Sequence, residues 1–159
     1  MTTSAADYDL TLPRKRVAAG ILFFDERNRV LLVDPIYKDP WEIPGGAVEA
    51  DEPPRAGARR ELKEELGLDL EPGRLLGVDW TQPRPGRSEG VVFVFDGGQL
   101  TSAQLAALQL QPDELRAYDY VALDQIGQRL LPILTRRVHA CAKARSESTT
   151  VYLENGEPV

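Results

Sequence analysis

Residues 46–68 read GAVEADEPPRAGARRELKEELGL, and this stretch predicts one helix together with both of its ends. Pro53 and Pro54 suit the first helical turn, because N–H groups there have no partner inside the helix and their loss costs nothing. Gly67 is placed to adopt the left-handed conformation that ends a helix. We therefore expect a helix of about four turns between these residues.

An apolar stripe should run along this helix. Ala58, Leu62 and Leu66 recur at i, i+4 and i+8, which places them on one face. That face can pack against a sheet, so the other side of the helix is left to face a cleft.

Three glutamates share another face of the helix. Glu61, Glu64 and Glu65 stand at i, i+3 and i+4, and each like-charged pair costs roughly 0.2–0.5 kcal/mol unless a cation lies among the carboxylates. Arg60 precedes Glu64 by four residues and can pair with it, which would hold the side chains in place around a metal. An acidic run on a helix is often only a solvated face, so a divalent-metal site is one of two interpretations of these residues.

The spacing of residues around the helix resembles the signature box of the Nudix hydrolases at every defining position. The box consists of Gly46, five intervening residues, Glu52, seven intervening residues and then RELKEELGL at residues 60–68. The lead-in WEIPGG, residues 41–46, is also similar to that family, and a looser likeness extends over roughly residues 15–140. With the whole pattern taken together, a chemical role for the glutamates is favoured over a solvated face.

The resemblance implies an α/β fold in which a mixed β-sheet is sandwiched between α-helices (α/β/α). We expect the Nudix hydrolase domain to span residues 14–145. Residues 1–13 are expected to form a flexible N-terminus and residues 146–159 a C-terminal tail. A single domain agrees with the length of 159 residues and the 42% hydrophobic content, which suffice for one core.

The resemblance also implies a reaction and the residues that carry it. Nudix hydrolases cleave a diphosphate linked to another moiety with Mg²⁺ or Mn²⁺, hard cations that prefer carboxylate oxygens. The metal ligands that the likeness implies are Gly45, through its backbone carbonyl, Glu61, Glu64 and Glu65. Glu61 is alternatively the general base. Arg60 belongs to the same catalytic set, and together with Glu52 it is expected to support the helix and its loops.

Some members of the family place one more acidic residue on a distant loop, as a ligand or base. Glu114 lies just before an expected strand, at a position similar to the acid of nucleoside-triphosphate-cleaving members, and is our first candidate for such a catalytic residue. Glu89, at the start of another expected strand, is the second. Either residue can equally be an ordinary surface carboxylate.

The remaining elements are predicted from hydrophobic patterning. Strands are expected at residues 16–24, 30–33, 75–81, 91–95 and 118–123. The first two are expected to form a hairpin. A short helix over 101–108, capped by Thr101 or Ser102, and a helical tail over 124–145, interrupted at Pro132, complete the chain.

The loop of residues 82–88 is the expected specificity element, because its prolines and glycine oppose regular structure. Arg84 and Arg87 suit bidentate phosphate binding. Pro83 lies 15 residues beyond Leu68, as in ADP-ribose-cleaving members of the family, although a loop proline also simply presets a turn. The same residues are similar to the start of the motif of NADH-cleaving members, but Arg84 stands where those have tryptophan, which argues against NADH.

Two aromatic residues precede the box. Tyr37 is a candidate substrate-binding residue because its ring can stack on a base, whereas Trp41 is expected to fill core space. His139, the only histidine, lies in the expected helical tail and is not expected to act in catalysis.

We therefore expect hydrolysis of a nucleoside diphosphate linked to another moiety, with ADP-ribose or another nucleotide sugar as the favoured substrate and Mg²⁺ or Mn²⁺ as the cofactor. Two alternatives stay open: a sanitising pyrophosphohydrolase of (deoxy)nucleoside triphosphates, and a nucleotide-binding regulator without turnover. The complete set of Arg60 and three glutamates argues against the regulator, since binding alone does not need every carboxylate.

Charge and composition restrict the partners. A net charge of −6 opposes binding to a nucleic-acid polymer or an anionic membrane, so a nucleotide-type small molecule is the expected ligand. Cys141 is the only cysteine, which rules out an intrachain disulfide. Residues 1–9 lack a basic start and an apolar stretch, so a cytoplasmic location is expected. Many ADP-ribose-cleaving members are dimers, which suggests a homodimer.

Overall fold

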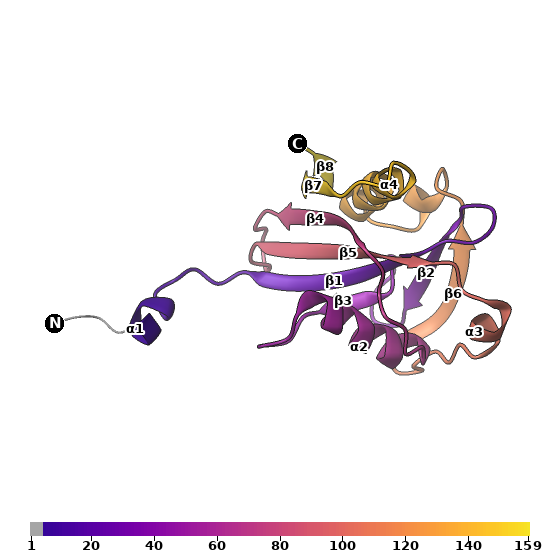
Figure 1. The fold of residues 1–159 in the computed structure, drawn as a ribbon, viewed down its shortest axis with the longest axis horizontal. Coiled ribbons are helices and arrows are strands. Elements are labelled where there is room, and N and C mark those ends of the chain that lie inside the picture. The colour runs from indigo at the N-terminus through magenta and orange to yellow at the C-terminus, as the bar shows by residue number, and fades with distance from the viewer. Residues whose placement is uncertain (1–4) are drawn as a thin grey trace.

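The computed structural model describes residues 5–159. The short helix α1 (Ala5–Asp9) has no buried residue, and Figure 1 shows it standing away from the rest of the molecule. Residues 1–4, the first part of the N-terminus that we expected to be flexible, lie outside the described residues. Within the described residues, no helix combines the length and the apolar character that crossing a bilayer requires.

A six-stranded mixed sheet forms the middle layer of the fold, in the order β3-β1-β5-β4-β7-β8. β1 pairs with β5 and β4 with β7 in parallel, and the other neighbours are antiparallel. The strands are β1 (Arg16–Phe23), β3 (Gly45–Ala47), β4 (Leu75–Thr81), β5 (Gly90–Gly98), β7 (Val151–Glu154) and β8 (Glu157–Pro158). Helix α2 (Pro54–Leu66) covers one face and α4 (Pro132–Ser146) the other (Figure 1), which confirms the expected α/β/α arrangement.

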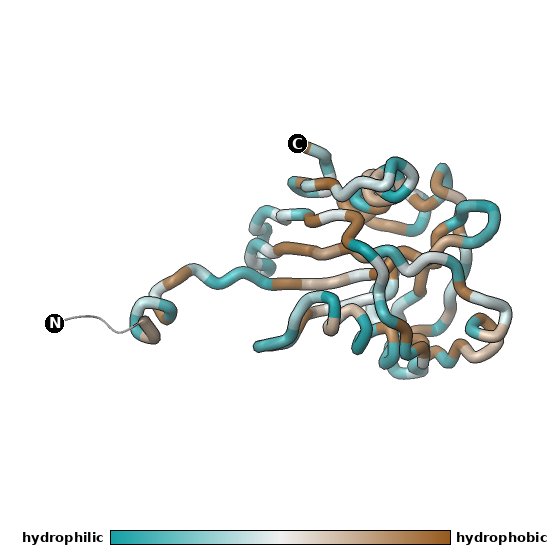
Figure 2. Tube along the Cα trace, in the orientation of Figure 1, coloured by the Kyte–Doolittle hydropathy of each residue, from teal (hydrophilic) through white to brown (hydrophobic). Residues whose placement is uncertain are grey.

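The second half of strand β1 and the residue that follows it are buried on both faces of the sheet. Ile21 and Phe23 belong to the apolar cluster on the α2 side, whereas Leu22 and Phe24 belong to the cluster on the α4 side. All four side chains are at most 1% exposed, because successive side chains of a strand point to opposite faces of the sheet. The apolar run of the sequence is thus a strand covered from both sides, and Figure 2 shows these hydrophobic strands between the two helices.

Helix α2 has the ends and the apolar face that the sequence predicted. Pro54 occupies the first turn, and Gly67 ends the helix with φ of 69°, donating its N–H to the carbonyl of Lys63. Ala58 and Leu66 are fully buried and Leu62 is 1% exposed, in contact with the sheet. The helix is therefore anchored by its apolar stripe, and its acidic face is directed elsewhere.

The expected hairpin between the first two strands is wrong. β2 (Val30–Pro35) pairs with β6 (Leu115–Val121) in a separate two-stranded sheet, and only one bridge, Phe24 to Val30, joins it to the end of β1. The physical reason is that both edges of β1 are already occupied, by β3 and β5. The strand expected at 118–123 also begins earlier, at Leu115.

The other helices differ from expectation in where they begin and end. Thr101 caps α3 (Ser102–Ala106) through a capping box with Gln104, but the helix is shorter than predicted. Pro132 does not interrupt a helix. It occupies the first turn of α4, where it leaves no helical N–H unpaired, and a separate 3₁₀ turn η1 (Ile126–Gln128) precedes it.

The segment expected as a C-terminal tail contributes to the main sheet. β7 pairs in parallel with β4, and Leu153 within it is fully buried. β8 pairs back onto β7, so residues 151–158 form a hairpin at the edge of the sheet. The folded unit therefore extends past residue 145, because β4 offers a free edge that a local sequence pattern does not reveal.

Candidate active site

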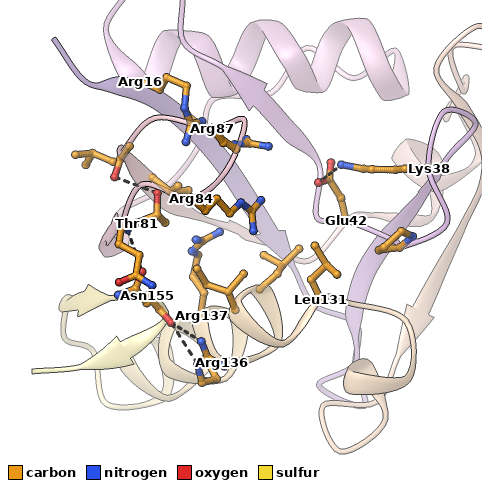
Figure 3. A pocket seen from close by; sticks show the side chains of 18 of the residues that line it. Arg16, Lys38, Glu42, Thr81, Arg84, Arg87, Leu131, Arg136, Arg137 and Asn155 are labelled. Atoms are coloured by element: carbon orange, nitrogen blue, oxygen red, sulfur yellow. Dashed lines mark hydrogen bonds and ion pairs between the residues drawn. The ribbon is translucent and has the colours of Figure 1, made fainter.

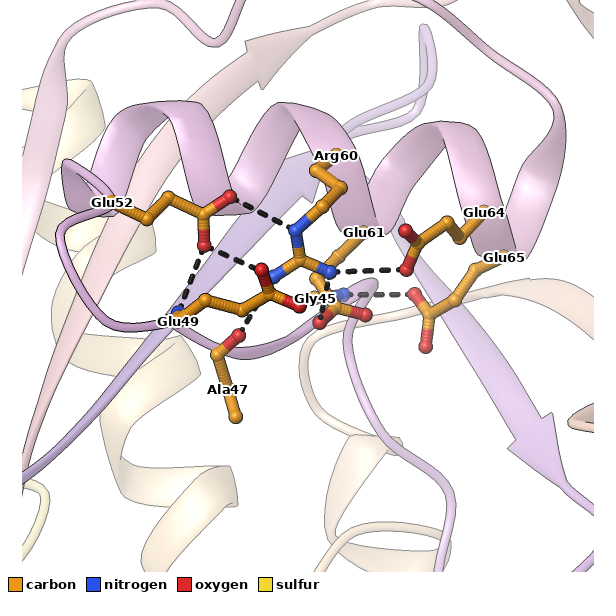
Figure 4. A network of polar contacts seen from close by, with 8 residues as sticks. All are labelled: Gly45, Ala47, Glu49, Glu52, Arg60, Glu61, Glu64 and Glu65. Carbon is orange, nitrogen blue, oxygen red and sulfur yellow. Dashed lines mark hydrogen bonds and ion pairs between the residues drawn. The ribbon is translucent and has the colours of Figure 1, made fainter.

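Arg60 holds together the carboxylates of three glutamates, two on α2 and one in the loop that precedes it (Figure 4). Its Nε and Nη2 atoms donate to Glu52 at 2.9 and 3.0 Å, and its Nη1 atom donates to Glu61 at 2.9 Å and to Glu64 at 3.0 Å. The hydrogen bonds to Glu52 raise the pKa of Arg60, although burial opposes the rise. The predicted pairing of Arg60 with Glu64 is confirmed, and one shared cation offsets the repulsion among the glutamates.

Glu52 and Arg60 also hold the loop before α2 in place. Glu52 accepts the N–H of Glu49 at 2.9 Å, and Arg60 donates to the carbonyl oxygen of Ala47 at 3.0 Å. The hydrogen bonds from Arg60 lower the pKa of Glu52. A Cβ on Gly57 would lie 2.9 Å from Glu52 Oε2, so a glycine in the helix leaves room for this carboxylate. Glu52 and Arg60 thus connect the helix to its preceding loop.

Glu65 is a nearly buried carboxylate at the C-terminal end of the acidic face. It is 8% exposed, and its Oε2 atom accepts the N–H of Gly45 at 2.9 Å. Burial raises the pKa of Glu65 to about 8; the bond from Gly45 opposes the rise, and the negative charges of Glu61, Glu114 and Glu42 add to it. A cation near Glu65 would favour its ionised form.

Two adjacent glycines bring the β3 backbone close to these carboxylates. Gly45 has φ of +139°, and a Cβ there would lie 2.2 Å from the carbonyl oxygen of Ala19. A Cβ on Gly46 would lie 2.5 Å from the carboxyl carbon of Glu61. Burial raises the pKa of Glu61, and its bond from Arg60 opposes the rise. A side chain at position 45 would therefore displace β1 or β3, and one at position 46 would displace Glu61. We call Glu61, Glu64 and Glu65 the acidic cluster.

The ligand types at this site fit a hard divalent cation. The predicted ligands Glu61, Glu64, Glu65 and Gly45 lie along one side of the interface between α2 and β3 (Figure 4). Arg60 donates to the carboxylates of Glu61 and Glu64, and the N–H of Gly45 donates to that of Glu65. Within residues 5–159, no three acidic, histidine or cysteine side chains converge closely enough to hold a metal ion. The carboxylate oxygens suit Mg²⁺ or Mn²⁺, and the negative surroundings of Glu65 supply a reason for a cation to bind.

Glu114 lies near this acidic cluster, whereas Glu89 is engaged elsewhere. The charge of Glu114 adds to the upward pKa shifts of Glu61 and Glu65. Its loop is tied to α2 by a hydrogen bond of 3.0 Å from Gln111 N–H to the Glu65 carbonyl. Glu89 instead forms an ion pair with Lys15 at 2.6 Å and accepts from Trp80 Nε1 at 2.8 Å, and these bonds lower its pKa. The structure therefore brings the first candidate, and not the second, to the box glutamates.

The two aromatic residues before the box occupy different environments. Tyr37 is 68% exposed, and its pKa is raised by burial and then by nearby carboxylates, those of Glu42, Glu65, Glu114 and Glu61. Trp41 is partly buried against the core cluster on the α4 side, as expected, and Arg129 stacks 4.4 Å from its ring centre. Tyr37 is thus beside the acidic cluster and Trp41 is mainly a packing residue.

A tight turn pairs the two arginines of the predicted specificity loop. Arg84 N–H donates to the Arg87 carbonyl at 2.9 Å and Arg87 N–H to the Arg84 carbonyl at 2.8 Å, around Pro85 and Gly86, which has φ of +75°. Residues that exchange both backbone bonds lie directly opposite each other with side chains on the same face. The sequence Arg-Pro-Gly-Arg therefore presents two guanidinium groups side by side. Pro83, exposed in the same loop, does not line the cavity that they enter.

These arginines enter a cavity of about 380 Å³, which we call the arginine cavity (Figure 3). Figure 3 shows Arg84, Arg87 and Arg137 pointing into it from the turn and from α4, with Arg16 of β1 beside Arg87. The pKa of Arg16 is lowered by burial and by the charges of Arg87 and Arg84. The five arginines that line the cavity are Arg16, Arg84, Arg87, Arg136 and Arg137. Such a gathering of like charges is typical of a site for anions.

A second, wider cleft of about 860 Å³ shares part of its lining with this cavity and extends to the β3 backbone, which contacts the glutamates of α2. It runs over β1 and β3 to the loop of residues 45–52. The glutamates of α2 line neither space, but Gly45 and Gly46, which contact Glu65 and Glu61, line the cleft. The residues that line both spaces include Arg16, Lys38, Glu42, Arg87 and Arg137. One extended ligand can therefore reach from the β3 backbone beside Glu61 and Glu65 to the arginines.

The sequence reasoning missed Arg16, Arg136 and Arg137. They come from β1 and α4, which are far from the box in the sequence, and an arginine at the start of a strand or on a helix is ordinary in itself. The parallel pairing of β1 with β5 and the packing of α4 on β4 bring them to the loop. No local signal identified them.

Comparisons of the sequence and of the fold with known proteins identify related hydrolases. The family model of the NUDIX domain matches residues 14–140. Diphosphoinositol polyphosphate phosphohydrolase 2 from Rattus norvegicus is 40% identical over 82 residues, which cover 51% of this chain and 46% of that protein. The chain spans about half the length of the curated relatives that it matches.

Solved structures share the fold at lower identity. A MutT NUDIX hydrolase from Burkholderia pseudomallei superposes with a TM-score of 0.66 at 25% identity, covering 83% of this chain and 98% of that one. A UDP-X diphosphatase superposes with a TM-score of 0.72 at 22% identity, covering 90% of this chain and 68% of the other.

Proposed function

This chain belongs to the Nudix family, and on that premise we propose that it is a metal-dependent hydrolase of phosphoric anhydride bonds. The observation that carries the proposal is the position of Glu65, which is buried beside Gly45 and close to two further acidic residues, Glu61 and Glu114. Such a site attracts a divalent cation and, through it, a diphosphate.

The residues of α2 and β3 would hold the cation. Glu61, Glu64 and Glu65 supply carboxylate oxygens for Mg²⁺ or Mn²⁺, with the carbonyl of Gly45 as a further ligand. When bound, such a cation neutralises the diphosphate and lowers the pKa of a coordinated water. Arg60 keeps the glutamates oriented through its bonds along the helix.

Glu114 is the proposed general base, with Glu61 as the alternative. It stands on a loop that is tied to the end of α2, and its negative charge acts on both Glu61 and Glu65. There it can take a proton from the attacking water. Tyr37, beside the same carboxylates, is placed to stack on a flat part of the substrate.

The rest of the substrate falls into one of two classes. A nucleoside diphosphate linked to another moiety, such as ADP-ribose or another nucleotide sugar, would use Tyr37 for the base and Arg84 and Arg87 for phosphate, with Pro83 shaping the loop. A diphosphoinositol polyphosphate, named in the relatives of this chain, is favoured by the arginine cavity, because several guanidinium groups suit several phosphates.

A substrate panel with purified protein tests this proposal. Phosphate release is measured with Mg²⁺, with Mn²⁺ and with a chelator on ADP-ribose, NADH, nucleoside triphosphates, dinucleoside polyphosphates and a diphosphoinositol polyphosphate. We expect metal-dependent turnover of either ADP-ribose or the inositol compound. Preference for triphosphates would identify a sanitising enzyme, and binding without turnover would identify a regulator.

The molecular mass of the protein in solution tests the expected homodimer.

The Glu114→Gln variant should reduce kcat by about 100-fold or more, because the amide cannot accept a proton. Glu89→Gln is the matched control: it also removes one carboxylate near a strand end, but one engaged by Lys15 and Trp80. Full activity of Glu114→Gln would show that the base lies within the box. Steady-state kinetics of the two variants on the best substrate of the panel supply the measurement.

A further inference from the structure

The hairpin formed by β7 and β8 lies beyond residues 14–140, where the family match ends. Its turn consists of Asn155 and Gly156, which have φ of 54° and 83°. Positive φ at both central residues defines a tight hairpin turn for which Asn-Gly is the preferred sequence. A Cβ on Gly156 would lie 2.6 Å from the carbonyl oxygen of Ile133, so this turn is pressed against α4.

Asn155 connects the turn to the loop that carries Arg84 and Arg87. Its N–H donates to the carbonyl of Trp80 at 2.8 Å, and its side-chain Oδ1 accepts the N–H of Gln82 at 3.0 Å. Gln82 is the first residue of the loop, and both Gln82 and Asn155 line the arginine cavity; Figure 3 shows Asn155 at its edge. The hairpin therefore fixes the base of the loop at the point where it leaves β4.

The same turn fixes both arginines at the start of α4. The carbonyl of Asn155 accepts from Arg136 Nη2 at 2.8 Å and Nε at 3.2 Å. The N–H of Gly156 donates to Asp79 Oδ1 at 3.0 Å, and Asp79 Oδ2 accepts from Arg137 Nε at 2.6 Å. The Arg137 side chain is 10% exposed, so it is held at the wall of the cavity by a buried partner.

The guanidinium groups opposite this wall have no carboxylate partner. Within residues 5–159, Arg16, Arg84 and Arg87 form no ion pair, and their side-chain hydrogen bonds are the two that Arg16 donates, from Nε at 3.1 Å and from Nη2 at 2.8 Å, to the carbonyl oxygen of Ser88. Like charges held on the same face repel each other, and the repulsion becomes attraction when an anion lies between them. A volume of about 380 Å³ is within the usual size of small-molecule sites.

We propose that the C-terminal hairpin, the Arg84–Arg87 turn and α4 together form a compartment that binds phosphate groups of the substrate other than the diphosphate that is cleaved. Asn155 and Asp79 are its positioning residues, and the arginines make the contacts. The assignment of these phosphates to a substrate rests on the proposed function; the binding of phosphate does not. The compartment selects for compounds that carry several anionic groups at a distance from the reacting bond.

Binding of inorganic tripolyphosphate to the whole chain, measured by calorimetry in a chelator, tests the compartment without metal or turnover. We expect the double variant Arg84→Gln/Arg87→Gln to weaken binding at least about tenfold, since two charge-assisted contacts are lost. Absence of binding to the unchanged protein, or equal binding by the double variant, would overturn the compartment.

A second pair of variants tests the hairpin itself. Asn155→Gly keeps the positive φ but removes the acceptor for Gln82, and we expect tripolyphosphate binding to weaken about three- to tenfold. Asn28→Gly is the matched control, because Asn28 also has a positive φ, 58°, but lines neither the arginine cavity nor the wider cleft. Equal effects of the two changes, or no effect of Asn155→Gly, would refute the role of the hairpin.

Turnover supplies a separate readout. On a substrate found with the panel, Asn155→Gly should raise KM while kcat stays unchanged, because the hairpin positions binding groups and not the reacting atoms. A fall in kcat at unchanged KM contradicts the positioning role. If the unchanged protein hydrolyses nothing, the proposed function fails, and the metal-free binding results still decide on the compartment.

Discussion

Replacing Glu64 with glutamine should lower kcat about 100- to 1,000-fold, because the amide is a poor ligand for a hard cation and the charge of the site falls by one. The Glu64 side chain is 53% exposed and makes its one ion pair with Arg60, so the fold does not depend on it. We therefore expect the unfolding midpoint to stay within the range of ordinary surface changes. Steady-state kinetics with Mg²⁺ and thermal unfolding are the two measurements.

Glu147→Gln is the matched control for this change. The Glu147 side chain is 54% exposed and pairs with a cation four residues away, Lys143, as Glu64 does with Arg60, but it follows α4 on the opposite face of the sheet. Its activity should equal that of the unchanged protein. Unchanged kinetics in Glu64→Gln would remove this residue from the proposed metal site.

Asp79→Ala should destabilise the chain by about 3–5 kcal/mol, the usual effect of leaving one member of a buried ion pair without its partner. Asp79 is fully buried on β4, and it accepts bonds from Arg137 on α4 and from Gly156 in the C-terminal turn. The variant loses both connections and leaves the charge of Arg137 unpaired. Denaturant unfolding followed by circular dichroism measures the free-energy change.

The exposed ion pair between Arg59 and Asp69 serves as a control that distinguishes the effect of burial from the effect of the contact itself. Arg59 Nε lies 2.6 Å from Asp69 Oδ1, the same distance as between Arg137 and Asp79, but the side chains of the exposed pair are 42% and 45% exposed. Asp69→Ala should therefore change stability far less than Asp79→Ala does, since water screens the interactions of Asp69 with Arg59 and Lys63. Similar losses in the two variants would mean that the buried bond has no special weight.

The box helix could be read from local sequence because each of its determinants acts within a few residues. Pro54 and Gly67 define its ends, and the stripe of Ala58, Leu62 and Leu66 is buried as predicted. The pairing of Arg60 with Glu64 follows from helical geometry alone. The choice between Glu114 and Glu89 could not be made in this way, because it depends on which distant loop reaches the end of α2.

Strand pairing was predicted less well than strand position. The runs that became β1 and β2 were identified, but adjacency in the sequence wrongly suggested a hairpin. A strand pairs with whichever edge is free, and both edges of β1 are occupied by β3 and β5. For the same reason the residues beyond 145 looked like a tail, although β7 completes the sheet beside β4.

By itself, the sequence determined the class of fold, the helix with its caps and the acidic face on which the proposed chemistry depends, since spacing along a helix directly sets which side chains are neighbours. Only the tertiary structure decided that Arg16, the Arg84–Arg87 turn and Arg137 face one cavity. It also decided that a C-terminal turn holds that cavity in shape through Asp79 and Asn155. These contacts join residues more than 50 positions apart, and no periodicity in the chain encodes them, because they arise from the order in which strands and helices pack.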